Sequence, residues 1–279
     1  MKIKNPVALI TGASSGIGKA LAVEFSKKNY TVIGTGRDKL KLEALEKSGI
    51  YTKQLDITRY EKTEETIKNI IAEFGSIDVL VNNAGYGLMA PIIDVTREDL
   101  ARQFETNLFA QLELTRKVVP FMKEKGKGLI VNIGSISGIV TTPFAGAYCA
   151  SKAAFHAVSD ALRMELSPFG IDVITVKPGG IVSDFGARAA EKTGNIILND
   201  DYLPIKEDIM LRAKSSQIGA MPADKFARKV VKIIADGKTP ADIYLGTMSF
   251  LLPFMKKIFP IKTLDSFLNK RFGIDKLKK

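Results

Sequence analysis

The most informative segment for the fold is Val7-Ala-Leu-Ile-Thr-Gly-Ala-Ser-Ser-Gly-Ile-Gly18. Its first four residues form a continuous apolar run, which is typical of a strand buried on both faces. Gly12, Gly16 and Gly18 follow, where a chain leaving a strand must turn into a helix. Glycine tolerates unusual backbone angles, and its missing side chain lets a pyrophosphate approach the main chain at a helix N-terminus. The segment therefore predicts a nucleotide-binding turn, which also contains Ser14, Ser15 and Ile17.

Apolar strands and amphipathic helices alternate along the rest of the chain. Strands are expected at 7–10, 30–35, 51–55, 79–81, 129–133, 172–176 and 241–245. Helices are expected at 17–28, 38–48, 63–74, 97–125, 147–167 and 222–235, the fourth with a bend near Pro120. This alternation predicts an α/β protein with a Rossmann-like, doubly wound parallel sheet in one domain, residues 1–247.

Charge and cysteine content restrict the setting in which the chain works. Of the net charge of +11, residues 248–279 contribute +6 through eight Lys or Arg against two Asp. The single Cys149 excludes an intramolecular disulfide and favours a reducing compartment. Neither a signal peptide nor an apolar run of about 18 residues is visible. We expect a protein that is cytoplasmic or peripherally attached to a membrane surface, without a metal site because His156 is the only histidine.

A second motif adds chemistry to the glycine turn. Tyr148-Cys-Ala-Ser-Lys152 places a tyrosine and a lysine four residues apart, on one face of the expected helix. Ser135 lies thirteen residues upstream of Tyr148, just after an apolar strand. Together with the glycine turn, these residues resemble the short-chain dehydrogenase/reductase family over roughly residues 5–235. Residues 139–148 and 168–172 resemble the branch with 17β-hydroxysteroid dehydrogenases and 1-acyl-dihydroxyacetone-phosphate reductases.

The resemblance implies an oxidoreductase and a catalytic role for four residues. Tyr148 would act as the acid in reduction and as the base in oxidation, with Lys152 lowering its pKa and holding the nicotinamide ribose. Ser135 would bind the substrate oxygen. Asn107 matches the family residue that holds a water in a proton relay.

The resemblance also implies the cofactor. The position that carries an acidic residue in NAD enzymes is Gly36 here, and Arg37 follows it. Arg37, with Ser14, would bind a 2′-phosphate, so NADP(H) is expected over NAD(H). Asp38 leaves an alternative open, because it could pair with Arg37 or bind the ribose itself.

Further family positions complete the expected cofactor site. Asp56 corresponds to the residue that binds adenine, although Asp is also a common helix cap. Asn83 belongs to the Asn82-Asn83-Ala84-Gly85 signature. Pro178, Gly179 and Ser183 resemble the Pro-Gly-x-x-x-Thr motif beside the nicotinamide, with Ser in place of Thr.

Residues 183–221 are expected to form a substrate lid without a regular pattern. Its apolar residues are Phe185, Ile196, Ile197, Leu198, Tyr202, Leu203, Ile209, Met210 and Leu211. They indicate a hydrophobic substrate such as a lipid, acyl-dihydroxyacetone-phosphate, steroid or retinoid, unless they only pack the lid onto the core. The basic amphipathic extension 248–279 suits a membrane surface, and it equally suits docking on the lid or on a second subunit.

Two other function classes compete with the enzyme. One is a sensor or scaffold that binds NADP(H) with little turnover, against which the complete Ser135, Tyr148 and Lys152 argue. The other is nucleic-acid binding through the basic extension, for which no recognised module is present, so no specific nucleic acid is expected. By resemblance, the helices that carry Asn107 and Tyr148 would form a homodimer or homotetramer.

Overall fold

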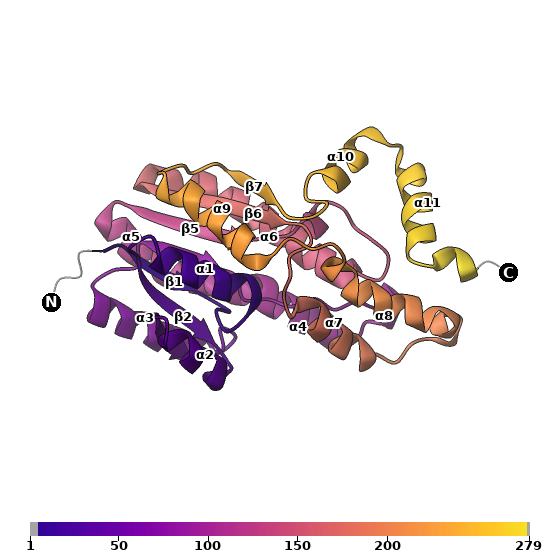
Figure 1. Ribbon diagram of the computed structural model, residues 1–279, viewed down its shortest axis with the longest axis horizontal. Coiled ribbons are helices and arrows are strands. Elements are labelled where there is room, and N and C mark those ends of the chain that lie inside the picture. Colours follow the sequence, from indigo (N-terminus) through magenta and orange to yellow (C-terminus); the bar gives the residue numbers. More distant parts are fainter. Residues whose placement is uncertain (1–4, 278–279) are drawn as a thin grey trace.

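The computed structural model describes residues 5–277, which form a single domain around a seven-stranded, all-parallel sheet (Figure 1). The strand order is β3-β2-β1-β4-β5-β6-β7. The strands are β1 (Val7–Ile10), β2 (Thr31–Gly36), β3 (Tyr51–Gln54), β4 (Val79–Asn82), β5 (Gly128–Ile133), β6 (Ile171–Pro178) and β7 (Asp242–Leu245). This arrangement confirms the predicted α/β, Rossmann-like fold.

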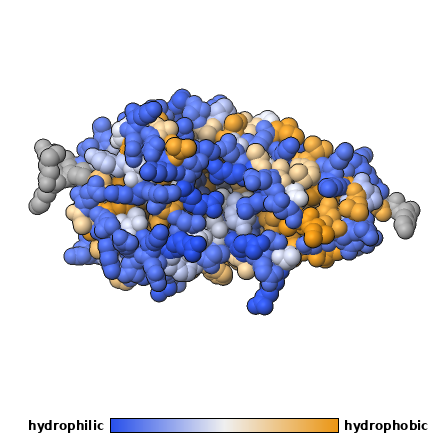
Figure 2. Space-filling model, turned by 90° about the horizontal axis from the view of Figure 1, so that it is seen from below, coloured by the Kyte–Doolittle hydropathy of each residue, from blue (hydrophilic) through white to orange (hydrophobic). Residues whose placement is uncertain are grey.

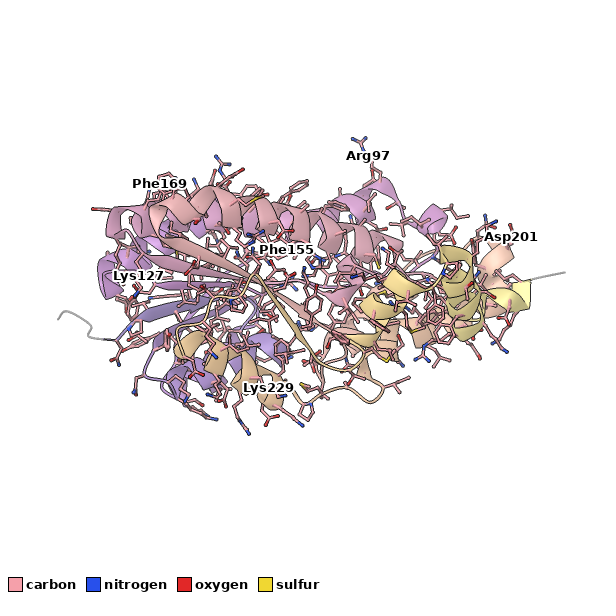
Figure 3. The ribbon with its side chains drawn as sticks, turned by 90° about the horizontal axis from the view of Figure 1, so that it is seen from above. Arg97, Lys127, Phe155, Phe169, Asp201 and Lys229 are labelled. Atoms are coloured by element: carbon pink, nitrogen blue, oxygen red, sulfur yellow. The ribbon has the colours of Figure 1, made fainter. Side chains whose placement is uncertain are left out.

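Helices cover both faces of the sheet. The helices on one face are α1 (Gly16–Ser26), α2 (Lys39–Glu46) and α9 (Ala223–Ala235), and those on the other are α3 (Tyr60–Phe74), α5 (Ala110–Lys125) and α6 (Gly146–Leu166). Figure 3 shows the two layers, with Phe155 of α6 on one side of the strands and Lys229 of α9 on the other. Fully buried apolar side chains such as Phe25 and Phe226 fill one interface, and Leu114 lies in the other. Because both faces of the central strands are covered, these strands need the continuous apolar runs seen in the sequence, whereas the edge strand β3 has no buried residue.

The long helix expected over 97–125 is interrupted. It consists of α4 (Arg97–Phe104), one π-helical turn (Glu105–Phe109) and α5. The irregularity therefore lies around Asn107, while α5 continues through Pro120. Asn107 in this turn is buried and hydrogen-bonded to a neighbouring loop, and π-helical turns are frequent at functional sites.

The segment 183–221, expected to lack regular structure, contains α7 (Phe185–Gly194) and α8 (Lys206–Lys214). Beyond β7, the chain forms α10 (Leu251–Ile258) and α11 (Ile261–Arg271). Leu264 and Leu268 of α11 are buried against Val140, and Phe272 packs against a cluster that contains Ile209 of α8. One face of the extension therefore docks on the protein's own lid.

The other face of the extension is exposed and apolar. Its exposed apolar side chains are those of Phe250, Leu251, Phe254, Ile258, Phe259, Ile261 and Phe267. Figure 2 views the molecule from below, on the side away from α10, and shows that apolar residues also gather there at the end of the molecule that carries the C-terminus, whereas hydrophilic residues dominate the opposite half. Among residues 5–277, no helix is long and apolar enough to cross a membrane.

Candidate active site

A cavity of about 850 Å³ lies at the carboxyl ends of the strands. It lies next to the neighbouring strands β1 and β4, from which the chain continues into helices on opposite faces of the sheet. Open α/β sheets bind their ligands at this point. The candidate site residues that line the cavity are Gly12, Ser14, Ser15, Gly16, Ile17, Arg37, Asp56, Asn83, Ser135, Tyr148, Lys152, Pro178, Gly179 and Ser183. Two predicted residues, Gly18 and Asn107, are not part of this lining.

The glycine turn has the geometry of a phosphate-binding loop. Gly12 and Gly16 have positive φ angles of 64° and 54°, which favour glycine. A Cβ on Gly16 would lie 2.9 Å from the Ser183 Cβ, so the turn and the lid touch here. A Cβ on Gly18 would lie 2.4 Å from the Gly12 carbonyl oxygen, which shows that Gly18 serves the close packing of α1. The bare main chain of this turn fits the close approach of a pyrophosphate.

The end of β2 carries Gly36 and Arg37, the two positions expected to decide between the cofactors. Arg37 is exposed, and its guanidinium has no carboxylate within 4.0 Å among residues 5–277. Asp38 does not pair with Arg37, because it caps α2 by accepting a hydrogen bond from the Lys41 N–H at 3.1 Å. A Cβ on Gly36 would lie 3.2 Å from the Ser14 Oγ, so a carboxylate at this position would be crowded. Ser14, which lies beside Gly36, and Arg37 both line the cavity.

Asp56 and Asn83 hold the loops around the cavity. The Asp56 Oδ1 accepts hydrogen bonds from the N–H and the hydroxyl of Thr58, at 3.1 and 2.8 Å. It does not cap α3 directly, since the residue before that helix is Arg59. The Asn83 side chain donates to the Thr11 carbonyl at 2.8 Å. Asn83 therefore ties β4 to the glycine turn.

Tyr148 is buried and lines the cavity, and the centre of its ring lies 5.4 Å from that of the Phe185 ring. Burial raises the pKa of Tyr148 to about 12, while Ser135 beside the phenol and the Arg212 charge act in the lowering direction. The prediction that Lys152 lowers this pKa is not supported, because Lys152 does not contribute to the shift. The phenol is accordingly protonated at neutral pH.

Lys152 is also buried, and its ammonium donates a 2.7 Å hydrogen bond to the Ile133 carbonyl. Burial lowers the pKa of Lys152 to about 8. This hydrogen bond holds the ammonium at the end of β5, the strand that leads into Ser135. Lys152 lines the cavity, and among residues 5–277 its ammonium has no other hydrogen-bond acceptor than the Ile133 carbonyl.

Asn107 lies behind the cavity. Its Oδ1 accepts from the Tyr86 N–H at 3.1 Å, and its Nδ2 donates to the Tyr86 carbonyl at 3.0 Å and to the Ser151 Oγ at 3.1 Å. The Ser151 hydroxyl in turn donates to the Tyr148 carbonyl at 2.8 Å. Asn107 thereby connects the π-helical turn to the helix that carries Tyr148.

His156, for which the sequence suggested no role, supports Ser135. Its Nε2 accepts a 3.3 Å hydrogen bond from the Ser135 N–H. Burial and the charges of Lys177 and Lys152 lower the pKa of His156 to about 4, so the ring is a neutral acceptor. The sequence feature that indicates this role is the position of His156 one turn beyond Lys152, on the same helix face.

Two arginines of the lid also belong to the site, although the sequence did not indicate them. Arg188 of α7 donates to the Ser15 Oγ at 3.1 Å and so reaches the glycine turn. Arg212 of α8 is buried in the cavity wall, although the sequence suggested only apolar residues around it. Among the apolar lid residues named above, only Phe185 lines the cavity. Much of its apolar lining comes instead from Met248, Leu252, Phe267, Leu268 and Phe272 of the extension.

The metal-binding side chains do not gather anywhere in residues 5–277: no group of three His, Cys, Asp or Glu could hold an ion there. Ser135, Tyr148 and Lys152 line the same cavity as the glycine turn and Arg37.

Known proteins are similar to this chain in sequence and in fold. The family model described as short chain dehydrogenase matches residues 6–194. An NADPH-dependent 1-acyldihydroxyacetone phosphate reductase of Saccharomyces cerevisiae is 31% identical over 280 residues, covering 97% of this chain and 92% of the relative. A 3-ketodihydrosphingosine reductase of Bacteroides thetaiotaomicron is 33% identical over 246 residues, covering 87% and 88%. The crystal structure of a short-chain dehydrogenase from Streptomyces avermitilis aligns with a TM-score of 0.80 at 28% identity, covering 99% of both chains.

The match spans the glycine turn, the Tyr148 helix and the strands between them, and the relatives extend over nearly the whole chain. The protein belongs to the short-chain dehydrogenase/reductase family and is an NAD(P)-dependent oxidoreductase that acts on CH–OH groups.

Proposed function

We propose that the protein is an NADP(H)-dependent oxidoreductase that interconverts a ketone and a secondary alcohol on a hydrophobic substrate. The observation that carries the proposal is that Ser135, Tyr148 and Lys152 line the same cavity as the glycine turn and Arg37. Arg37 without a carboxylate partner in residues 5–277 supports NADP(H) over NAD(H). The names of NADPH-dependent relatives agree with this preference.

The bound nicotinamide would supply or accept the hydride, and the chain's own residues provide orientation and the proton. Ser135 binds the substrate oxygen and stabilises the negative charge that develops on it. Tyr148 donates its phenolic proton to that oxygen in reduction, for which its raised pKa supports the protonated form. Lys152 holds the ribose hydroxyls of the cofactor.

Other residues of this proposal bind the cofactor or position the side chains that react. The cofactor contacts are assigned to Gly12, Ser14, Ser15, Gly16, Ile17, Gly18, Arg37, Asp56, Asn83, Pro178, Gly179 and Ser183. Asn107 and His156 position Tyr148 and Ser135 through the hydrogen bonds described above. The relay water assigned to Asn107 by resemblance remains part of the proposal.

The substrate is proposed to be apolar because the extension gives the cavity an apolar wall. Lipids, acyl-dihydroxyacetone-phosphate, steroids and retinoids all fit that description. Relatives whose names specify 1-acyldihydroxyacetone phosphate and 3-ketodihydrosphingosine favour the lipids.

The outer face of residues 248–277 is proposed to contact a membrane surface. Exposed Phe250, Phe254 and Phe259 lie in the same short segment as Lys256 and Lys257. Such a mixture binds anionic lipid without spanning the bilayer. A homodimer or homotetramer through α5 and α6 is proposed by family resemblance.

The proposal is tested with purified protein by following NADPH and NADH oxidation against a panel of ketones. The panel contains an acyl-dihydroxyacetone-phosphate, a steroid, a retinoid and a short polar ketone. We expect turnover with NADPH and an apolar ketone, and a much lower kcat/KM with NADH. NADPH binding without reduction of any ketone would contradict the enzyme and favour a sensor.

A further inference from the structure

Arg212 is a buried charge without a counter-ion in the described part of the chain. Its side chain leaves α8 and is only 7% exposed. No carboxylate of residues 5–277 lies within 4.0 Å of the guanidinium, and Tyr148, Cys149 and Arg271 are the titratable groups that act on it. Buried charges in proteins are normally paired, because an unpaired one loses its hydration without compensation.

The hydrogen bonds of Arg212 leave part of its donor capacity free. The Nε and Nη2 atoms donate to the Thr142 Oγ1 at 3.2 and 2.7 Å, and Nη1 donates to the Ser215 Oγ at 3.2 Å. A guanidinium has five N–H donors, so two of them have no acceptor among residues 5–277. Two neutral hydroxyls orient the group and do not neutralise it.

Arg212 is part of the wall of the cavity that Tyr148 also lines. Arg212, Thr142 and Ser215 all line that cavity, and Arg271, an exposed residue, lines it as well. The guanidinium of Arg212 lies 5.1 Å from the centre of the Phe272 ring, and that of Arg271 lies 5.9 Å from it. Two arginines around one aromatic ring give this end of the cavity a positive potential.

We propose that Arg212, assisted by Arg271, binds an anionic group of the substrate, so that the ketone is an amphiphile with a phosphate or carboxylate near its carbonyl. The inference rests on the proposed function and narrows its substrate class. It excludes uncharged steroids and retinoids as the preferred ligands. A phosphate or carboxylate presents the planar or forked acceptors that a guanidinium binds best.

The cavity also provides a route for the apolar chain of such an amphiphile. Leu252, Phe267 and Leu268 line it on the side of the extension. Leu268 is buried, whereas Phe267 is 47% exposed, so the apolar lining continues to the outer surface. An anionic end at Arg212 and a chain along the extension would place the reacting carbon beside Tyr148.

The test uses decyl phosphate and 1-decanol, a pair that differs in the anionic group and contains no reducible carbonyl. Their binding to the protein saturated with NADPH is measured by isothermal titration calorimetry. Wild type is expected to bind decyl phosphate about ten- to hundredfold more tightly than decanol. Arg212→Met should remove this difference and Arg212→Lys should retain part of it. Arg228→Met, which removes an exposed arginine of α9, should leave the difference unchanged.

Equal binding of the two probes to wild type would overturn the inference, as would a phosphate preference that survives in Arg212→Met. A preference seen only without NADPH would place the phosphate in the cofactor groove and also overturn it. If Arg212→Met does not fold, the inference is decided by the binding of the two probes to wild type and to Arg212→Lys. Because no turnover is needed, decyl phosphate binding at Arg212 combined with a failure to reduce any ketone would contradict the proposed function alone.

Discussion

Replacing Arg37 by alanine should reduce the affinity for NADPH while leaving that for NADH unchanged. Arg37 follows β2, lines the cavity and has no carboxylate partner among residues 5–277. In our account its guanidinium pairs with the 2′-phosphate, which NADH lacks. The variant therefore removes an interaction that only one of the two cofactors can make.

The magnitude follows from the exposure of Arg37. A hydrogen bond to a charged group contributes about 1.5–3 kcal/mol, and solvent screening of an exposed pair favours the lower end of that range. About 1.4 kcal/mol corresponds to a tenfold change in Kd. We expect Arg37→Ala to raise the Kd of NADPH about tenfold.

The assay is a titration of both cofactors by isothermal titration calorimetry, at one fixed ionic strength. Lys47→Ala is the matched control, because it removes a positive charge from an exposed residue just beyond α2. An equal loss for NADPH and NADH would show that Arg37 acts on the fold or on general electrostatics. An unchanged NADPH Kd would refute the assignment of Arg37.

Three further variants test the rest of the site. Gly18→Ala should cost about 1–3 kcal/mol of unfolding free energy through overpacking, because its Cβ would lie 2.4 Å from the Gly12 carbonyl oxygen; a loss below about 0.5 kcal/mol in urea would contradict this. Asn107→Ala should cost about 1–3 kcal/mol by leaving the partly buried Tyr86 N–H without its acceptor, and stability equal to wild type would refute its structural role. Lys152→Met should remove a pH dependence: the folded pKa of about 8 lies below the ordinary 10.5, so the unfolded chain binds more protons between these values and wild type gains stability relative to the variant as the pH rises through them. A constant difference between the two proteins from pH 8 to 10.5 would contradict the buried lysine.

Much of the fold could be predicted because the central strands of a doubly covered sheet must be apolar throughout. The run at 7–10 and the glycines behind it appear as β1, the turn and α1 at the expected places. Tyr148 and Lys152 share a helix face in the structure, as their spacing of four predicts. These features depend on local sequence alone.

The electrostatics of the site could not be predicted, because burial is a property of the whole fold. A phenol four residues from a lysine suggested a lowered pKa, yet the surroundings of Tyr148 raise it to about 12. Arg212 lies on a short helix between apolar residues, and its burial depends on the folded surroundings, where the ring of Phe272, just beyond α11, lies 5.1 Å from its guanidinium. The extension, for which a membrane surface, the lid and a second subunit were equally open as docking sites, provides much of the apolar cavity wall.

The central claim is that Tyr148 transfers the proton in a site that binds NADPH independently of it. Tyr148→Phe removes only the hydroxyl, and Tyr30→Phe makes the same change at a half-buried tyrosine outside the cavity. The measurement is the rate of a single turnover of the protein saturated with NADPH, on the best ketone of the panel. The account predicts that Tyr148→Phe binds NADPH as wild type does and reduces the ketone at least about a hundredfold more slowly, while Tyr30→Phe matches wild type. A Tyr148→Phe variant that turns over at the wild-type rate would contradict the account.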